Sequence, residues 1–372
     1  MKLTSQMIKE RAAELGIDCI AIGNIERFAG APKLMAPQSI FPEARSVIAV
    51  AMRIPRGTYR GIEEGTHWHN YTFYSYNKLN TLFRPHLSYE LCCFIEDHGY
   101  EAVPHFPAVP EGNGTTREPV AEGKLPPDVV CSVRVIAAGC GIGEIGYSKV
   151  FLTKKFGPRV RLGLIFTDAE LEPDPILDTG DICLHCGACV RECPGNAVPP
   201  VKNKDERLYV DFNGEKQIWY ADVRMGRCTL SHHGLNNECS PFLKKEFPNM
   251  ALEVRNTEMT EEEAYIMTYT MADGKWGRKP GTQVMNYYDY IKKHTGYYAI
   301  CGARGCIRAC MNALEKTKRI ENLFHNPFYY KKSWLLPHEP TEVPEGVNPY
   351  REAYLDEKYP GIRDGEYVKA KK

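Results

Sequence analysis

A run of four closely spaced cysteines constrains this chain more than any other feature of its sequence. The run reads Cys183-Leu-His-Cys186-Gly-Ala-Cys189-Val-Arg-Glu-Cys193-Pro194, the spacing C-x2-C-x2-C-x3-C-P of bacterial ferredoxins. In that arrangement three thiolates bind one [4Fe–4S] cluster, and the fourth cysteine binds a second cluster. Zinc sites rarely space four cysteines in this way. The run therefore predicts two iron–sulfur clusters, the first held by Cys183, Cys186 and Cys189 and the second by Cys193.

A second, less regular group of cysteines lies at Cys301, Cys306 and Cys310. Its last two members keep the C-x3-C spacing, although Met311 takes the place of the usual proline. In two-cluster ferredoxins the last cysteine of each group binds the cluster of the other group. We therefore expect Cys310 to complete the first cluster, and Cys193, Cys301 and Cys306 to hold the second.

The second cluster still needs a fourth ligand, and two cysteines between the groups are candidates. Cys228 precedes Thr-Leu-Ser-His-His, and Cys239 precedes Ser-Pro. The other five lie in apolar stretches, where we interpret them as small buried thiols: Cys19, Cys92, Cys93, Cys131 and Cys140.

The composition and the first residues indicate the cellular compartment of the protein and the kind of partner it binds. The 47 Lys and Arg residues balance 47 Asp and Glu residues, so the formal net charge is +0, which argues against a nucleic-acid partner. No apolar run approaches the roughly 20 residues of a membrane-spanning helix. The first residues, Met1-Lys-Leu-Thr-Ser-Gln-Met-Ile, lack an apolar signal core and a twin-arginine motif. We expect a cytoplasmic protein, because a reducing compartment keeps clustered thiols available for metal.

Helices and strands alternate along the first 170 residues, which indicates an α/β or α+β layer. Thr4 or Ser5 caps the first helix, and Gly16 ends it. Alternating apolar residues over 159–168 predict a strand with one face inward. The expected helices are 4–16 and 87–98, the expected buried strands are 19–22 and 46–52, and 129–139 and 147–152 are helical or strand-like around a glycine-rich turn.

Three regions follow from these patterns. We expect an α/β domain over 1–175, which binds cofactor and substrate. The cysteine module spans 176–325 and contains an insertion over 200–295, in which Thr260-Glu-Glu-Glu263 forms a capping box. Residues 326–372 are rich in proline, tyrosine and charge, and we expect them to wrap the body as a tail.

Two segments upstream of the cysteines resemble a known group of enzymes. They are Phe41-Pro-Glu-Ala-Arg-Ser-Val-Ile-Ala-Val-Ala51 and Ala138-Gly-Cys-Gly-Ile-Gly-Glu-Ile-Gly-Tyr-Ser-Lys-Val-Phe-Leu-Thr-Lys-Lys-Phe-Gly-Pro-Arg-Val-Arg-Leu-Gly-Leu-Ile-Phe-Thr-Asp168. Together with the cysteine groups, they are similar to the cobalamin-dependent reductive dehalogenases and the epoxyqueuosine reductases. The resemblance covers roughly residues 40–315.

This resemblance implies an α+β fold, in which a nitroreductase-like α/β layer binds cobalamin beside a ferredoxin-like module with two [4Fe–4S] clusters. The implied cofactor is base-off cobalamin, and the chain has no Asp-x-His-x-x-Gly motif that would place a histidine on cobalt. Cys228 is favoured over Cys239, because its segment loosely matches the one that supplies this ligand in epoxyqueuosine reductases. The implied cofactor-binding residues are Gly141, Gly143, Gly146, Tyr147, Ser148, Leu152 and Arg161, although relatives carry Lys or Arg at the position of Tyr147.

Enzymes of this kind need an acid that protonates the substrate as electrons arrive. Epoxyqueuosine reductases use an aspartate upstream of the glycine-rich turn, which falls within one residue of Asp128; capping the next helix is the alternative role. Dehalogenases use a tyrosine backed by a basic residue, for which Tyr100 and Arg161 are the candidates. Their alternative roles are core packing for Tyr100 and the solvent face of a strand for Arg161.

Two further features have open roles. The aromatic segment 67–76 either lines a substrate or corrin pocket or packs in the core. His232 and His233 are expected to donate hydrogen bonds near a cluster rather than to bind metal.

The function implied by the resemblance is reductive cleavage of a carbon–halogen or carbon–oxygen bond in a small molecule. A ferredoxin or flavodoxin would supply electrons, which two clusters relay to the buried cofactor. Epoxyqueuosine reduction in tRNA is one alternative, and an electron carrier without a corrin is the other. The neutral charge and the long segment between the cysteine groups argue against tRNA.

Overall fold

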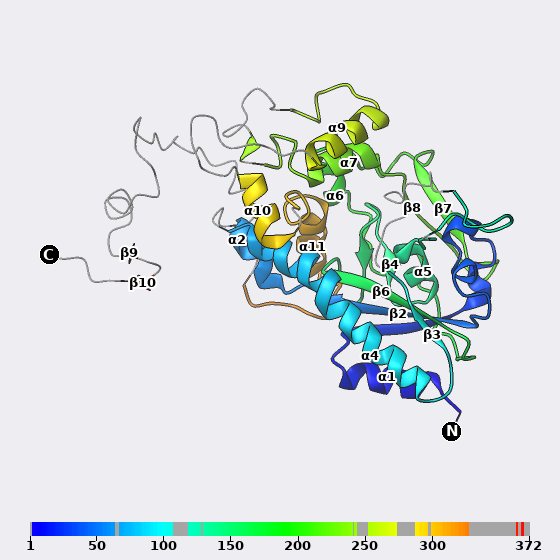
Figure 1. Ribbon diagram of the computed structural model, residues 1–372. Coiled ribbons are helices and arrows are strands. Elements are labelled where there is room, and N and C mark those ends of the chain that lie inside the picture. The colour runs from blue at the N-terminus through cyan, green and yellow to red at the C-terminus, as the bar shows by residue number, and fades with distance from the viewer. Residues whose placement is uncertain are drawn as a thin grey trace, which may run out of the picture. The chain divides into compact units, whose positions relative to one another are not determined.

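A four-stranded antiparallel sheet organises the N-terminal part of the computed structural model (Figure 1). Strand β2 lies in its interior, and its side chains are buried on both faces up to Met52. The register pairs Ile48 of β2 with Ile165 of the neighbouring strand. In spatial order the strands are β1 (Cys19–Asn24), β2 (Ser46–Arg53), β6 (Val160–Thr167) and β3 (Ala102–Pro104).

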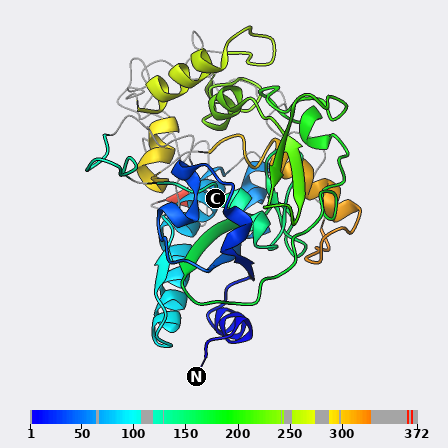
Figure 2. The ribbon, with the colours of Figure 1, turned by 90° about the vertical axis from the view of Figure 1, so that its right-hand side faces the viewer.

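Helices cover both faces of this sheet, because successive side chains of a strand point to opposite sides. On one face Val47, Ala49 and Ala51 pack with α5 (Val133–Gly139). On the other face Ile48, Val50 and Met52 pack with α1 (Ser5–Glu14) and α4 (Arg84–Glu96). Figure 2 shows the same layers from the side. The expected α+β fold is confirmed.

Local signals at the helix ends match the structure. The Thr4 hydroxyl accepts a hydrogen bond from the backbone N–H of Met7 at 3.3 Å, and the chain leaves α1 through Gly16 at φ +82°. Thr260 and Glu263 form the reciprocal bonds of a capping box at the start of α9 (Glu261–Asp273). These short-range predictions are confirmed.

The sequence predicted that only one face of strand β6 would be buried, but the structure covers both faces. Leu164 and Phe166 face the α5 side, as expected, but Ile165 is buried against α4 on the other side. Arg84 of α4 donates a hydrogen bond to the carbonyl of Leu162 at 2.6 Å. Arg161 donates to the Ser75 carbonyl in the segment before α4 and lies against the Tyr76 ring, so this half-buried side chain does not lie on an open solvent face.

The cysteine module is built from short elements around three helices that carry cysteines. Helix α6 (Ala188–Arg191) packs on α11 (Cys306–Lys316), and α7 (Met225–His232) packs on α9. The remaining elements come from several parts of the chain. The helical ones are α2 (Arg60–Glu63), α3 (His69–Tyr71), a π-helix (Thr72–Phe83), α10 (Tyr287–Thr295) and four 3-10 turns (Ile25–Phe28, Lys33–Met35, Pro37–Ser39, Arg56–Tyr59). The strand pairs are β4 (Glu144–Ile145) with β5 (Phe151–Leu152), β7 (Arg207–Asp211) with β8 (Gln217–Ala221), and β9 (Ile362–Arg363) with β10 (Glu366–Tyr367).

The structure describes residues 2–63, 67–106, 118–127, 129–240, 242–243, 252–273, 287–296, 299–326, 362–363 and 366–367. Met1–Ser333 forms one compact unit, and Trp334–Lys372 forms a second. The boundary expected at residue 175 and the tail expected over 326–372 stay predictions. Within the described ranges, no helix has both the length and the apolar character that crossing a bilayer requires.

Candidate functional site

The four cysteines predicted for the first cluster line one small cavity. Cys183, Cys186 and Cys189 come from the run itself, and Cys310 reaches them from α11. Burial raises the pKa of Cys189 to about 11 and that of Cys310 well above its usual range, so metal binding must displace protons from these thiols. Thiols gathered from both groups in one cavity are a donor set that fits a [4Fe–4S] cluster.

A buried glutamate in the glycine-rich turn accepts hydrogen bonds from the backbone at the start of the cysteine run. The Glu144 carboxylate accepts hydrogen bonds from the backbone N–H groups of Gly180 at 2.7 Å, Ile182 at 2.7 Å and Cys183 at 3.0 Å. Glu144, Cys183 and His185 have the spacing of a possible metal site. Three N–H donors already occupy the carboxylate, so we interpret Glu144 as a clamp on the loop and not as a ligand.

The glycine-rich turn lies against the protein itself. A side chain at Gly141 would meet the Pro175 carbonyl at 2.2 Å, and one at Gly143 would meet the Leu152 carbonyl at 2.1 Å. These close approaches explain both glycines without a bound group. The other cofactor-binding candidates of the turn, Gly146, Tyr147, Ser148 and Leu152, line the cavity of the first cysteine set.

Two of these residues act on the thiols directly. The Tyr147 backbone N–H donates to the Cys183 sulfur at 3.4 Å. A hydrogen bond from Ser148 lowers the pKa of Cys189, against the larger effect of burial. N–H and O–H donors to ligating sulfur are one means by which a protein tunes a cluster. In this structure, therefore, the turn serves the first cysteine set.

The second cysteine set is also brought together, deeper in the molecule. Burial raises the pKa of Cys301 well above its usual range, and the nearby thiols of Cys239, Cys306, Cys193 and Cys228 raise it further. Cys306 interacts in the same way with Cys228 and Cys193. Four residues separate Cys301 from Cys306, where two separate neighbouring cysteines in the first run, and this wider gap does not keep Cys301 from the set.

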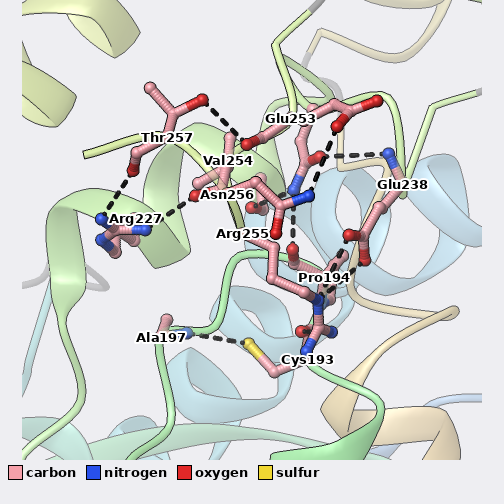
Figure 3. A network of polar contacts seen from close by, with 12 residues as sticks. Cys193, Pro194, Ala197, Arg227, Glu238, Glu253, Val254, Arg255, Asn256 and Thr257 are labelled. Carbon is pink, nitrogen blue, oxygen red and sulfur yellow. Dashed lines mark hydrogen bonds and ion pairs between the residues drawn. The ribbon is translucent and has the colours of Figure 1, made fainter. Parts of the chain in front are cut away.

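Residues of the insertion hold Cys193 in place (Figure 3). Arg255 donates to the Cys193 carbonyl at 2.7 Å and pairs with Glu238 at 3.2 Å. The buried side chain of Asn236 donates to the Pro194 carbonyl at 3.0 Å, and the Ala197 backbone N–H donates to the Cys193 sulfur at 3.2 Å. The insertion thus fixes the point where the run crosses from one set to the other.

The two candidates for the eighth ligand have different surroundings. The Cys239 thiol donates to the carbonyls of Ser231 at 3.0 Å and Asn236 at 3.3 Å, which satisfy it without metal. The Cys239 thiol interacts with Cys301 and Cys193, and the Cys228 thiol interacts with Cys193, Cys301 and Cys306, the three other members of the expected set. The choice of Cys228 stays a prediction, supported by its interaction with Cys306 and by the carbonyl acceptors of Cys239.

A cluster of tyrosines surrounds Arg161 beside the second set. The guanidinium of Arg161 lies 4.1 Å from the ring centre of Tyr76, and its Nε donates to the Ser75 carbonyl at 2.8 Å. Burial lowers the pKa of Arg161, but Tyr76, Tyr71 and Tyr59 oppose it and the net pKa is raised. Arg161 therefore stays cationic in a largely buried site.

These tyrosines connect the arginine to the second set. The ring centres of Tyr59 and Tyr71 are 5.0 Å apart, and those of Tyr71 and Tyr76 are 5.8 Å apart. A side chain at Gly302 would meet the Tyr71 hydroxyl at 2.4 Å, and Tyr59 interacts electrostatically with Cys306. The aromatic segment 67–76 therefore packs against the second cysteine group, with its tyrosines around a cation.

Three buried polar atoms in this cluster, the hydroxyl oxygens of Tyr71 and Ser75 and the Nη2 atom of Arg161, have no well-formed hydrogen bond among the described residues. The Tyr71 hydroxyl and the Arg161 guanidinium do interact with each other electrostatically. Buried polar groups are normally satisfied, so such a group points to a bound polar molecule. A corrinoid side chain or a substrate would supply the missing partners, and on this observation the residues fit a polar cofactor or substrate.

His232 also lies at this cluster. Its ring centre is 5.3 Å from that of Tyr76, and its carbonyl accepts from the Ile300 backbone N–H at 2.8 Å. Burial, His233 and Arg161 hold the pKa of His232 well below its usual range, so the imidazole is neutral. No metal-ligating group in the described residues includes either histidine.

Of the two residues predicted as proton donors, only Tyr100 lies within the described residues. Asp128 lies outside the described residues. Tyr100 follows α4, whose last turns lie next to α1, whereas α6 and α11, which carry Cys189, Cys306 and Cys310, lie farther from α1 (Figure 1). Tyr100 packs against the core there, as its alternative role requires. Sequence patterns alone do not single out Tyr59 or Glu144, although Glu144 is the one acid inside the glycine-rich turn.

A second cavity, of about 970 Å³, opens at the β3 edge of the sheet. Its lining is mainly apolar, and His105 and Lys124 are among its few polar residues. The Nε2 atom of His105 accepts the Cys131 backbone N–H at 3.1 Å. A cavity of this size accommodates a drug-sized molecule.

No protein-family model matches the chain. Tetrachloroethene reductive dehalogenase of Dehalobacter restrictus is 30% identical over 142 residues, which are 37% of this chain and 22% of that protein. The enzyme of the same name from Sulfurospirillum multivorans is 33% identical over 134 residues, 36% of this chain and 23% of that protein. The match thus spans less than a quarter of the length of these dehalogenases.

A longer match is found with epoxyqueuosine reductase of Bacillus cereus, which is 24% identical over 275 residues, 66% of this chain and 63% of that protein. Among solved structures, a catabolic reductive dehalogenase aligns with a TM-score of 0.42 and 18% identity, covering 84% of this chain and 36% of that chain. A selenomethionine-labelled epoxyqueuosine reductase aligns with a TM-score of 0.40 and 16% identity, covering 84% and 82%. The homologues of this chain are thus the reductive dehalogenases and the epoxyqueuosine reductases, the group that its motifs resemble.

Proposed function

We propose that this chain is a reductase that holds two [4Fe–4S] clusters and a corrinoid, and that it cleaves a carbon–halogen or carbon–oxygen bond in a small molecule. The cavity in which Cys310 joins Cys183, Cys186 and Cys189 carries the proposal. A crossed set of this kind belongs to two-cluster electron relays. The named homologues are reductases, which supports the same class of reaction.

The two cysteine sets would have different roles in electron transfer, because they differ in exposure. The first contains Cys186, an exposed thiol, whereas every thiol of the second is half-buried or buried. Electrons would enter at the first set and pass inward to the second, next to the tyrosines and Arg161. The corrinoid, when bound, supplies a strongly reducing cobalt centre for the bond cleavage.

The chain's own residues would bind and orient the substrate beside the second set. The Arg161 guanidinium, which is cationic and lies beside Tyr71 and Tyr76, would bind the electronegative leaving group through its Nη2 atom. Burial raises the pKa of Tyr71 well above its usual range, so its hydroxyl keeps its proton and can donate it as a hydrogen bond. The packed rings of Tyr59 and Tyr76 would exclude water. Asp128 remains our candidate for the proton donor.

The direct test is anaerobic reconstitution with iron, sulfide and cobalamin, followed by metal analysis and EPR. We expect about eight iron atoms per chain, the content of two [4Fe–4S] clusters, and a base-off cob(II)alamin signal. Iron without retained cobalamin would contradict the corrinoid and support an electron carrier. Absence of both would contradict the whole proposal.

The second candidate is reduction of epoxyqueuosine in tRNA. The match to the Bacillus cereus enzyme extends over 275 residues, about twice the 142 residues matched in the dehalogenase, so tRNA is kept as a possible substrate despite the neutral net charge. One reconstituted preparation should be given, in parallel, a chlorinated alkene, a halogenated phenol and a tRNA stem loop that carries epoxyqueuosine. Queuosine formation without halide release would decide for tRNA.

We also place the protein in the cytoplasm, because thiols that bind clusters need a reducing compartment. A ferredoxin or flavodoxin of that compartment would be the electron donor. Within this proposal, residues 1–175 form the cofactor- and substrate-binding region and 176–325 the cluster region.

A further inference from the structure

An exposed face of the cysteine module surrounds the first cysteine set. Cys186 is the exposed thiol of the cavity, and its neighbour His185 is half-buried. The other seven predicted ligands, in both sets, are half-buried or buried, so Cys186 is the one exposed thiol among them. An outside molecule can therefore approach the first set most closely, at Cys186.

Three arginines rim this face. Arg191 donates to the Cys186 carbonyl at 3.1 Å, Arg319 to the Gly180 carbonyl at 2.9 Å, and Arg207 to the Val201 carbonyl at 3.0 Å. Each is tied to backbone, and no ion pair joins any of them to a carboxylate in the described part of the chain. Their positive charges are therefore available to a partner.

Acidic groups also lie near this face. Asp178 pairs with Lys216 at 2.6 Å, and Glu206 pairs with Arg224. The Asp181 carboxylate accepts the Asp178 backbone N–H at 3.0 Å and keeps its charge, and Glu192 follows Arg191 in the chain. The three arginines outnumber these two carboxylates, so the charge of the face is positive, although the whole chain is formally neutral.

Aromatic groups link this face to the first set. The rings of His185 and Trp219 are stacked with centres 4.7 Å apart, and Arg207 lies 3.9 Å from the Trp219 ring centre. Tyr147, whose N–H bonds to the Cys183 sulfur, has its ring 6.3 Å from that of Trp219. A partner seated here would lie a short distance from the cluster position.

We infer that the arginine face, formed by Arg191, Arg207, Arg319, His185, Cys186 and Trp219, is the docking surface for a small acidic electron-transfer protein. This inference rests on the proposed function. In the transfer step, one electron leaves the reduced carrier, which is oxidised, and reduces the first [4Fe–4S] cluster from the 2+ to the 1+ state, with no bond made or broken. Complementary charge speeds such encounters and makes their rate depend on salt.

The test uses the reconstituted holoprotein and flavodoxin hydroquinone, an acidic one-electron donor whose oxidation is visible by stopped-flow absorbance. The double variant Arg191→Glu/Arg319→Glu should lower the second-order rate constant about tenfold or more at low ionic strength. Arg191→Gln/Arg319→Gln should have a smaller effect. High salt should lower the rate constant of the wild type and reduce the difference between the wild type and the Arg191→Glu/Arg319→Glu variant.

The matched control is Lys2→Glu/Lys33→Glu, which makes the same change in net charge at two exposed lysines outside this face. It should leave the rate constant unchanged within about twofold. A second control is reduction by a zwitterionic viologen, which needs no docking surface and should proceed equally in all variants. Equal slowing by both charge reversals, or by neither, would overturn the inference.

Two further outcomes separate this inference from the function on which it rests. A preparation that binds no iron contradicts the proposed function itself. Full iron content and normal viologen reduction, with unchanged flavodoxin rates in the Arg191→Glu/Arg319→Glu variant, contradict only the docking surface. Loss of tRNA stem-loop binding in that variant, without loss of flavodoxin transfer, would assign the face to nucleic acid instead.

Discussion

The Glu144 carboxylate accepts the backbone N–H of Cys183 at 3.0 Å and so holds the first cysteine of the run from a position 39 residues earlier. Two more N–H donors, from Gly180 and Ile182, meet the same carboxylate. The side chain is 4% exposed, and burial raises its pKa even though these bonds lower it. A two-residue strand in the glycine-rich turn thereby positions a predicted cluster ligand.

Replacing Glu144 with Gln should destabilise the protein by about 1–3 kcal/mol, because a glutamine offers one acceptor oxygen and leaves at least one buried N–H unsatisfied. Anaerobic urea unfolding gives the change in midpoint. Glu14→Gln is the matched control, since that carboxylate is 66% exposed and forms only a surface pair with Arg11. Equal midpoints for the two variants would contradict the clamp.

The eighth cluster ligand can be identified by a pair of substitutions. Cys228→Ala should remove about four of about eight iron atoms or convert the second cluster to a three-iron form, whereas Cys239→Ala should keep full iron content. The reason is that carbonyl acceptors already satisfy the Cys239 thiol. Cys92→Ala, in α4, controls for loss of a buried thiol. The reverse iron contents would make Cys239 the ligand.

Arg161→Gln should lower kcat/KM about 10- to 100-fold for whichever substrate is turned over, because it removes a charge-assisted hydrogen bond to the leaving group. Arg161→Lys should recover part of this loss. Iron content should match the wild type in both variants, which separates a role at the substrate from a role in folding. Arg53→Gln, at the exposed end of β2, is the control. Unchanged turnover in Arg161→Gln would exclude Arg161 from the site.

The free energy of unfolding should decrease as the pH falls, because the pKa of His105 is lower in the folded protein than in the unfolded chain. Burial, and then Arg84, lowers the pKa of His105 to about 4 from 6.5. Between these two pH values the unfolded chain binds the proton and the folded protein does not, so stability is present above pH 6.5 and is lost as the pH falls toward 4. The loss is about 3 kcal/mol at most.

His105→Gln should flatten this part of the pH profile of the urea midpoint. His86→Gln, on an exposed histidine of α4, should keep the wild-type slope. A slope that persists in His105→Gln would assign the acid sensitivity to other groups.

Local patterns predicted much of the fold. The cap at Thr4, the strand that became β2 and the capping box at Thr260 and Glu263 were all predictable, because each depends on residues within a few positions of one another. The burial of the second face of β6 was not predictable, because α4, which covers this face, comes from a distant part of the chain. An alternating pattern shows which face is apolar, but it does not show what packs on the other face.

The candidate site divides in the same way. The two cysteine groups and a spacing that suits crossed clusters could be read from the chain, because ligand spacing within a run is a local property of the backbone. The fold was needed to show that Cys310 shares a cavity with Cys183, that Glu144 and Arg255 hold Cys183 and Cys193, and that Arg161 lies among tyrosines. These contacts join segments far apart in the chain, and their positions are set by the packing of the whole unit rather than by neighbouring residues.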